Sequence, residues 1–177
     1  MIEDPLPDFV IIGPQKCATT WIYLGLQEHP DISMPNTDAI NYFSMNYHRG
    51  DNWYKQFFKS SQEDTIVGEV SRSYVRDDAA PRRIQNDLPT AKLIISVRNP
   101  VDRAYSHYWH EKSKGKLSFE FKEVFENYDL FQNWVVPGFY YRHVQRFLHE
   151  FPENQVKLVL FDDLVDDNEA FIQDIYD

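Results

Sequence analysis

The chain has 177 residues, of which 42% are hydrophobic and 16% aromatic, and its formal net charge is −10 at pH 7. This length and composition predict one globular domain with a substantial core and exclude an intrinsically disordered chain. The negative charge argues against general binding to nucleic acid or anionic membranes, because such binding needs a surplus of Lys and Arg on one face.

The predicted secondary structure begins with a strand, a loop and a helix. Residues 9–12, FVII, form an apolar run typical of a buried strand, and residues 19–30 form a helix that opens on two threonines and is closed by Pro30. Residues 31–64 are polar, aromatic and irregular, apart from a short helix at 53–58. Long irregular segments often carry function, so we expect this one on the substrate side of the protein.

The rest of the chain alternates strands and helices. The predicted elements are a strand at 65–71, a helix at 79–88, a strand at 91–97, helices at 99–114, 119–128 and 139–151, a strand at 156–161 and a helix from about 168. Asn99 and Pro100 suit the N-cap and the first position of the 99–114 helix. This alternation predicts an α/β fold with a central parallel sheet flanked by helices.

Cysteine content and the N-terminal segment bear on location. Cys17 is the only cysteine, so no intrachain disulfide can form. Residues 1–30 contain no apolar stretch of the kind found in a signal peptide or a membrane span. We therefore expect a cytoplasmic protein that does not bind membranes or nucleic acid.

The first motif, GPQKCATT at 13–20, lies between the first strand and the first helix. A glycine-containing loop at a helix N-terminus offers backbone N–H groups and the positive end of the helix dipole to an anion. Lys16 adds a full charge, but it follows Gly13 by three positions, whereas the lysine of kinases and GTPases follows the first glycine by six. The motif predicts an anion site of another kind; the alternative is that Lys16 is an ordinary solvated loop residue.

The second motif, RNPVDRAYSHY at 98–108, begins where the strand at 91–97 ends. Arg98 lies at the carboxyl end of a buried strand, where ligands bind in open α/β sheets. Ser106 falls about two turns into the following helix, on the same face as Arg103. An arginine fork and a hydroxyl at this position suit a second phosphate, although each residue alone is also common on ordinary protein surfaces.

Together the two motifs resemble the nucleotide-binding motifs of sulfotransferases that use 3′-phosphoadenosine 5′-phosphosulfate (PAPS). The likeness extends through INYF, NWYKQFF, GEVSRSY, APRRI and LFDDL, and it is closest to the bacterial and heparan-sulfate-type branches. It implies a P-loop-NTPase-like sulfotransferase fold and no metal. It also implies transfer of a sulfuryl group to a hydroxyl or amine of a small-molecule or glycan acceptor, with adenosine 3′,5′-bisphosphate (PAP) as product.

The resemblance implies roles for single residues. Lys16 would contact the 5′-phosphosulfate and stabilise charge on the leaving phosphate. Arg98 and Ser106 match the positions that bind the 3′-phosphate, and Trp21 matches an aromatic residue that lies against adenine, with a core position as its alternative. The implied nucleotide-binding set is Gly13, Pro14, Gln15, Lys16, Cys17, Ala18, Thr19, Thr20, Trp21, Arg98 and Ser106.

The sequence departs from the family pattern at the catalytic base. Many members carry KE two residues before HFF or HYF, and that glutamate takes the acceptor proton; here TDAINYF places Ala39 at the glutamate position, and alanine cannot accept a proton. Glu69 is the preferred replacement and Asp38 the second candidate, while a purely structural carboxylate is the alternative for Glu69. Otherwise the acceptor needs little assistance, or the domain binds PAPS and PAP with impaired catalysis.

The C-terminus is a second departure. Family domains usually continue beyond LFDDLVDDNEAFIQDIYD through a helix and a loop with basic residues. We therefore expect residues 1–177 to form a single sulfotransferase-like domain that lacks the family's C-terminal segment. Four further arginines could line a site for an anionic glycan, or could form a solvated face paired with nearby aspartates; they are Arg72, Arg76, Arg82 and Arg83.

Overall fold

The computed structural model of the chain describes residues 5–59, 61 and 64–176. Within this part of the chain, five parallel strands form a sheet in the order β2-β3-β1-β4-β5. The strands are β1 (Phe9–Ile12), β2 (Ile32–Ser33), β3 (Ile66–Val70), β4 (Lys92–Val97) and β5 (Val156–Leu160). The predicted central parallel sheet is confirmed.

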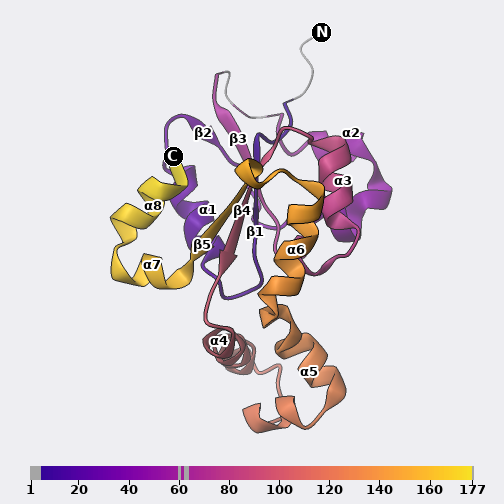
Figure 1. Ribbon diagram of the computed structural model, residues 1–177, viewed down its shortest axis with the longest axis vertical. Helices are drawn as coiled ribbons and strands as arrows, with labels where there is room; N and C mark the ends of the chain where they lie inside the picture. The colour runs from indigo at the N-terminus through magenta and orange to yellow at the C-terminus, as the bar shows by residue number, and fades with distance from the viewer. Residues whose placement is uncertain (1–4, 60, 62–63, 177) are drawn as a thin grey trace.

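Helices cover both faces of the sheet. In Figure 1, α1, α7 and α8 lie on one side of the strands, and α2, α3 and α6 lie on the other. The α-helices are α1 (Thr19–Gln27), α2 (Asp51–Lys55), α3 (Ala80–Asp87), α4 (Pro100–Ser113), α5 (Tyr128–Trp134), α6 (Tyr140–Glu150), α7 (Phe161–Asp166) and α8 (Asn168–Tyr176). Short helices of other kinds include the π-helix η1 (Tyr42–Asn46) and the 3-10 helix η4 (Phe121–Phe125).

The alternation of side chains along β1 explains the two cores. Val10 and Ile12 pack into a core with residues of α3 and α6, whereas Phe9 and Ile11 pack into a core with residues of α1 and α8. Successive side chains of a strand point to opposite faces, so a strand covered on both sides is apolar throughout. That is why FVII could be read as a buried strand.

Some boundaries differ from the sequence-based expectation. The first helix ends at Gln27, three residues before Pro30, and the predicted helix at 119–128 is instead the 3-10 helix η4 followed by α5. The side chain of Asn127 accepts a hydrogen bond from the Leu130 backbone N–H and starts α5 there. Neither β2 nor α7 was expected; β2 has only two residues, too few to show a periodic pattern, and it is held by pairing with β3.

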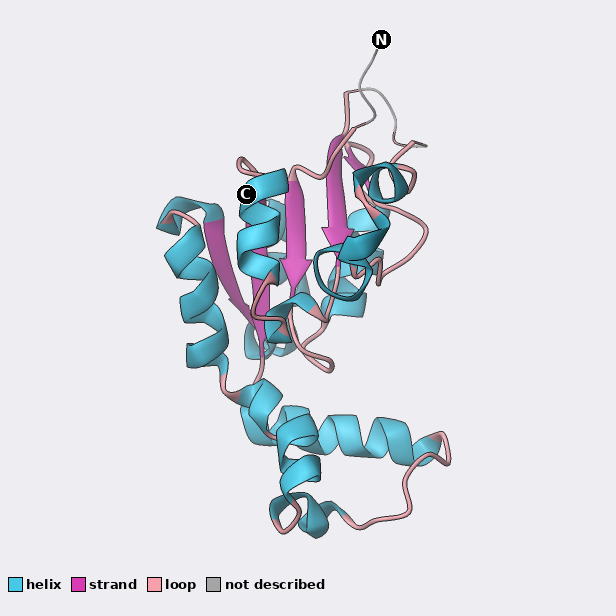
Figure 2. Ribbon diagram, turned by 90° about the vertical axis from the view of Figure 1, so that its right-hand side faces the viewer, coloured by secondary structure: helices cyan, strands magenta, loops and turns pink. Residues whose placement is uncertain are grey.

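A smaller helical unit lies beyond the carboxyl ends of the strands. Figure 2 shows α4, η4 and α5 below the tips of the strand arrows, and this unit has a core of its own built on Tyr108, Val124 and Trp134. The Asn99 side chain accepts hydrogen bonds from Val101 N at 3.0 Å and Asp102 N at 3.4 Å, as expected of an N-cap. Because α4 begins directly after β4, its residues lie over the strand ends.

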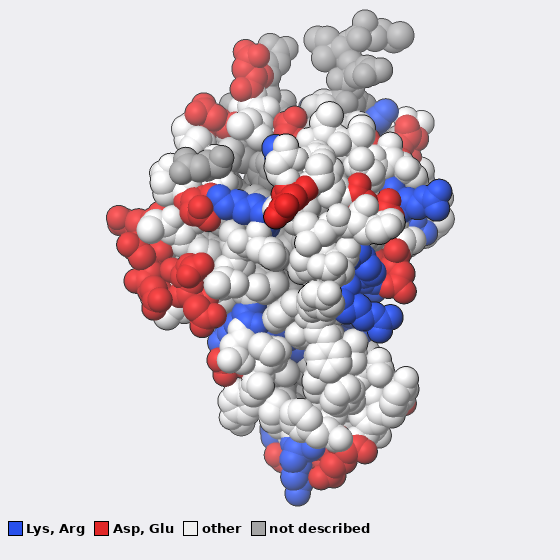
Figure 3. Space-filling view, in the orientation of Figure 1, with Lys and Arg blue, Asp and Glu red and all other residues white. Residues whose placement is uncertain are grey.

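The negative charge of the chain is unevenly distributed. Acidic side chains gather over α7 and α8 (Figure 3), where they belong to Asp162, Asp163, Asp166, Asp167, Glu169 and Asp174. A separate group of Lys and Arg residues lies at the carboxyl ends of the strands, as described below. A local basic site therefore coexists with the overall charge of −10.

Candidate active site

The loop between β1 and α1 is shaped to receive an anion. Lys16 and Ala18 adopt left-handed conformations with φ of 75° and 63°, which are typical of the backbone nests that bind anions. Ala18 is the N-cap of α1, and among the described residues no side chain caps this helix. Gly13 allows the loop to pass close to β4, because an added Cβ would lie 2.8 Å from the carbonyl oxygen of Ser96. The N–H groups of the first turn of α1 thus face the loop's concave side.

A small cavity of about 280 Å³ opens at this loop. Lys16 and Thr20 contribute from the loop and α1, Arg72 from the segment after β3, and Lys114 from the end of α4. The other lining residues are Gln15, Ala18, Thr19, His110 and Glu111. Three cationic side chains beside a helix N-terminus suit a doubly charged anion.

The charges around Lys16 also favour an anion site. Its half-buried position lowers the pKa of its ammonium group, and the nearby charges of Arg98, Lys114 and Arg72 lower it further. Asp38 and Glu111 offset part of this clustered positive charge, and a bound anion would offset more of it. The loop is therefore suited to hold a phosphate or sulfate group rather than a neutral ligand.

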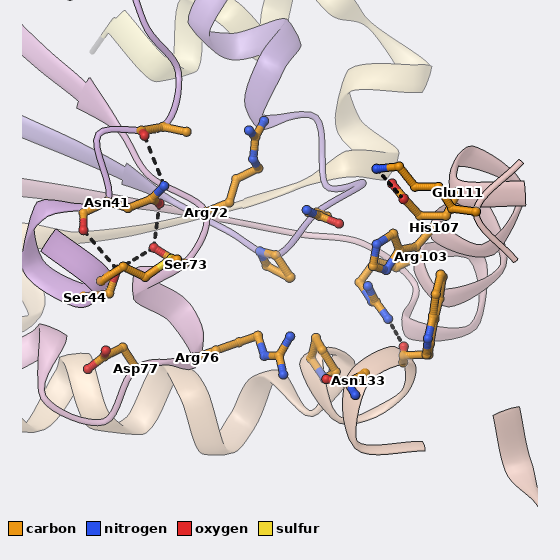
Figure 4. A pocket seen from close by; sticks show the side chains of 17 residues that line it. Asn41, Ser44, Arg72, Ser73, Arg76, Asp77, Arg103, His107, Glu111 and Asn133 are labelled. Atoms are coloured by element: carbon orange, nitrogen blue, oxygen red, sulfur yellow. Dashed lines mark hydrogen bonds and ion pairs between the residues drawn. The ribbon is translucent and has the colours of Figure 1, made fainter. Parts of the chain in front are cut away.

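A larger cavity of about 810 Å³ adjoins the small one. The two cavities share Gln15, Arg72 and Glu111 in their walls. Figure 4 shows Asn41, Ser44 and Ser73 at one end of the larger cavity. At its other end lie Arg103, His107 and Glu111, contributed by α4 (Figure 4). The arrangement offers a compartment for an anionic group next to a roomier, polar compartment for a second molecule.

Comparison with known proteins identifies the family. Residues 6–177 match the family described as the sulfotransferase domain. The chain belongs to the sulfotransferase domain family. It is 38% identical over 175 residues to human bifunctional heparan sulfate N-deacetylase/N-sulfotransferase 3, which covers 88% of this chain and 20% of that protein. It is 37% identical over 190 residues to mouse bifunctional heparan sulfate N-deacetylase/N-sulfotransferase 1, and this match covers 97% of this chain and 21% of that protein. The chain thus spans about one fifth of the length of these curated relatives.

Solved structures agree on the fold. A sulfotransferase from Alicyclobacillus acidocaldarius superposes with a TM-score of 0.85 at 28% identity, over 97% of this chain and 79% of that one. A mouse sulfotransferase complexed with PAP superposes with a TM-score of 0.62 at 20% identity, over 96% of this chain and 57% of that one. The domain therefore has the P-loop-like sulfotransferase fold that its two motifs predicted.

Most of the predicted nucleotide-binding residues of this sulfotransferase domain come together at the first loop. Gln15, Lys16, Ala18, Thr19 and Thr20 line the small cavity, and Pro14 lines the larger one. Gly13 and Cys17 are buried beneath the loop, where the Cys17 carbonyl oxygen accepts a hydrogen bond from the Ser96 hydroxyl. These two residues shape the loop instead of lining a cavity.

Of the second motif, Arg98 contacts the first motif, whereas Ser106 does not line its cavity. Arg98 Nη1 donates to the carbonyl oxygen of Lys16 at 3.4 Å, and the Arg98 guanidinium lies over the Phe161 ring at 4.1 Å. Ser106 is half-buried on α4 and lines neither of the two cavities. Trp21 is 38% exposed and makes an edge contact with Phe171. Binding of the 3′-phosphate and the adenine by these residues stays a prediction.

Arg103 does not act as the free arginine fork expected beside Ser106. Its side chain is 1% exposed, and Nη2 donates to the carbonyl oxygen of Trp134. Burial lowers the pKa of its guanidinium. Arg103 therefore joins α4 to the end of α5 and itself forms part of the wall of the larger cavity.

Ala39 and Asp38, which the motif alignment set at the base and its neighbour, have different surroundings in the structure. Ala39 lines the larger cavity and offers no side-chain proton acceptor there. Asp38 Oδ2 lies 2.8 Å from Arg72 Nη1 and accepts a hydrogen bond from the Thr20 hydroxyl at 3.5 Å. The Asp38 carboxylate thus orients Arg72 toward the small cavity, which is a positioning role.

Glu69 occupies the core and not the site. Its side chain has 0% exposure, and its two carboxylate oxygens accept hydrogen bonds from the hydroxyls of Tyr54, Ser71 and Tyr74. Burial raises the pKa of this carboxyl, and the three hydrogen bonds oppose the rise. The Glu69 carboxylate lines neither cavity. The geometry favours the structural role, which the sequence had left as the alternative.

The structure adds residues at the end of α4 and just after it that sequence reasoning did not assign to the site. Glu111 lines both cavities, Lys114 lines the small one, and Lys116 lines the larger one. The residues at 103, 107 and 111 of α4 follow one another at four-residue spacing, which places them on one helix face. That spacing was visible in the sequence, but which face meets the loop depends on how α4 packs.

The described residues were also compared with the side-chain groups that bind metals and with the helices that span membranes. His107, His110 and Glu111 have a spacing that could mimic a metal site, but no group of three or more His, Cys, Asp or Glu side chains suited to a metal ion occurs within residues 5–59, 61 and 64–176. In the same part of the chain, no helix is both long and apolar enough to cross a bilayer.

Proposed function

We propose that this sulfotransferase domain transfers a sulfuryl group from PAPS to an amine or hydroxyl of an anionic glycan. The observation that carries the proposal is the pair of adjoining cavities, one cationic and built on the N-terminus of α1, the other larger and polar. A donor and an acceptor held in these two compartments would meet at the wall that Gln15, Arg72 and Glu111 share.

The small cavity fits the donor's phosphosulfate. Bound PAPS would supply the sulfuryl group and a good leaving group, the phosphate of PAP. Lys16 and the first turn of α1 would stabilise the charge that develops on the oxygen of the departing phosphate. Arg72, held by Asp38 at 2.8 Å, would place a second cation near the group in transfer. Arg98 and Ser106 are proposed to bind the 3′-phosphate.

The larger cavity fits an anionic acceptor. Arg72 and Arg76 line it from the segment after β3, and Lys116 lines it from beyond α4. The side chain of Arg82 lies away from this cavity, in a separate hollow between α3 and α6, while Arg83 donates to the Phe43 and Ser44 carbonyl oxygens. The relatives' names describe heparan sulfate N-sulfotransferases, which supports a sulfated or carboxylated glycan as acceptor.

A domain that binds PAPS and PAP but transfers inefficiently is the second candidate. Ala39 favours it, because this residue lines the acceptor cavity at the position where the family pattern has its base. A cytoplasmic location and a single domain over residues 1–177 remain predictions from the sequence.

Calorimetry tests the donor assignment. Titration with PAP should give an affinity at least about tenfold higher than titration with adenosine 5′-monophosphate, a difference of about 1.4 kcal/mol, since only PAP carries the 3′-phosphate. Arg98→Ala should abolish this preference, while Arg142→Ala, at an exposed position of α6, should leave it intact. Equal affinity for the two nucleotides in the wild type would refute the PAPS assignment.

Transfer itself is measured with PAPS and N-deacetylated heparan sulfate. Sulfate incorporation that depends on the glycan would support the proposed enzyme. Tight PAP binding without incorporation would favour the second candidate.

A further inference from the structure

Four carboxylates near the two cavities are candidates to accept the proton of the acceptor amine or hydroxyl. They differ in their partners and in which cavity they line. Asp38 is paired with Arg72, and Glu69 has no exposed surface. Asp77 lines the larger cavity only, and its Oδ1 accepts hydrogen bonds from Ala79 N at 2.8 Å and Ala80 N at 3.1 Å, where it holds the start of α3. Glu111 differs from all three, because it lines both the small and the larger cavity.

The contacts of Glu111 are exchangeable. Its Oε1 lies 3.3 Å from Lys114 Nζ, and its Oε2 lies 3.4 Å from Lys116 Nζ. The Glu111 side chain is only 19% exposed, whereas those of Lys114 and Lys116 are 43% and 61% exposed. Ion pairs with such solvated lysines are weak, so an anion bound nearby can compete for the ammonium groups. Lys114 also lines the small cavity and is thus placed to turn toward a bound anion.

The base strength of Glu111 depends on those two lysines. Burial raises the pKa of the Glu111 carboxyl, but the hydrogen bonds and charges of Lys114 and Lys116 outweigh burial and lower it. When the lysines turn to the phosphosulfate, the lowering contributions are lost and the carboxylate becomes a stronger base. The charged or titratable groups that face Glu111 or share its cavities are Lys16, Arg72, Arg76, Asp77, Arg103, His107, His110, Lys114 and Lys116.

We propose that Glu111 is the general base of this domain and takes over the role of the family's glutamate, which is replaced by alanine at position 39. The inference rests on the proposed function. The acceptor nitrogen or oxygen forms a bond to sulfur as the bond from sulfur to the 5′-phosphate oxygen breaks. The electron pair of the broken bond stays on that phosphate oxygen beside Lys16, and the acceptor's proton passes to a carboxylate oxygen of Glu111. Charge and atoms balance without a metal or a redox partner.

Glu111→Gln tests the assignment, because glutamine keeps the shape of the side chain and cannot take the proton. With PAPS and N-deacetylated heparan sulfate, kcat should fall by about 10²-fold or more, the range of general base catalysis. Affinity for PAP, measured by calorimetry, should stay equal or increase, because Lys114 is released. Glu120→Gln is the matched control: Glu120 is 70% exposed, pairs with Lys112 and lines neither cavity, so its kcat should match the wild type.

Two further readouts separate a base from a merely structural residue. The fall of wild-type kcat toward acidic pH should be absent from Glu111→Gln, and a fall that persists would assign the titration to another group and overturn the inference. Ala39→Glu, introduced into the Glu111→Gln chain, should restore kcat by about tenfold or more, because it returns a carboxylate to the wall of the same cavity.

The outcomes distinguish this inference from the proposed function. A wild-type chain that neither prefers PAP nor transfers sulfate would refute the proposed function. A wild-type chain that transfers sulfate, with Glu111→Gln transferring at the same rate, would leave that function standing and refute Glu111 as base. Loss of both PAP affinity and kcat in Glu111→Gln would show that Glu111 holds the donor site together, which also overturns the inference.

Discussion

Replacement of Glu69 by glutamine should destabilise the fold rather than disable the chemistry. Three hydroxyls donate to the buried Glu69 carboxylate, those of Ser71 and Tyr74 at 2.5 Å and that of Tyr54. Glutamine keeps one acceptor oxygen but turns an N–H₂ group toward the Tyr54 hydroxyl. Each hydrogen bond to a charged group contributes about 1.5–3 kcal/mol. One such bond is lost, and release of the buried charge offsets part of the loss, so we expect a decrease of about 2 kcal/mol in the free energy of unfolding.

Urea unfolding followed by tryptophan fluorescence measures this decrease, and the chain's four tryptophans supply the signal. Glu28→Gln, at an exposed position, is the control and should change stability by less than about 0.5 kcal/mol. Tyr54→Phe in both backgrounds completes a double-mutant cycle, with an expected coupling above about 0.5 kcal/mol. A Glu69→Gln chain as stable as the wild type, with kcat lowered about 10²-fold, would refute the structural role and identify Glu69 as the base.

Three more predictions concern the site. Lys16→Ala should lower sulfate transfer by about 10²-fold or more while near-ultraviolet circular dichroism stays unchanged, and retained turnover would contradict the assignment of the loop. Ala39→Glu alone should change kcat by less than about threefold, because Glu111 already accepts the proton; a large gain would show that a base was missing. Burial lowers the pKa of His107 from 6.5 to about 4, so its neutral form favours the fold, and the stability it supports above pH 6.5 is lost as pH falls toward 4. Urea unfolding at pH 7 and pH 5 should therefore show a smaller acid loss in His107→Gln than in the wild type, and equal losses would contradict this reasoning.

The sequence by itself determined the features that depend on near neighbours. The apolar run at 9–12, the loop with Gly13 and Lys16, and the N-cap at Asn99 all appear in the structure where the sequence predicted them. Each of these features depends on residues close together in the sequence, so hydrophobic periodicity and capping chemistry are enough to predict it. The parallel orientation of the strands followed from the alternation of elements, although their order in the sheet did not, and the two motifs were enough to indicate the family.

Only the tertiary structure decided which charged groups meet. Glu69 and Arg103 were candidates for chemistry by residue type, but packing buried one among Tyr54, Ser71 and Tyr74 and the other against Trp134. Conversely, Glu111 and Lys114 lie nearly a hundred residues after Lys16 and line the same cavity. Their meeting depends on how α4 packs beyond the strand ends, where it shares a core with η4 and α5. Burial and long-range proximity come from that packing, and local sequence does not encode them.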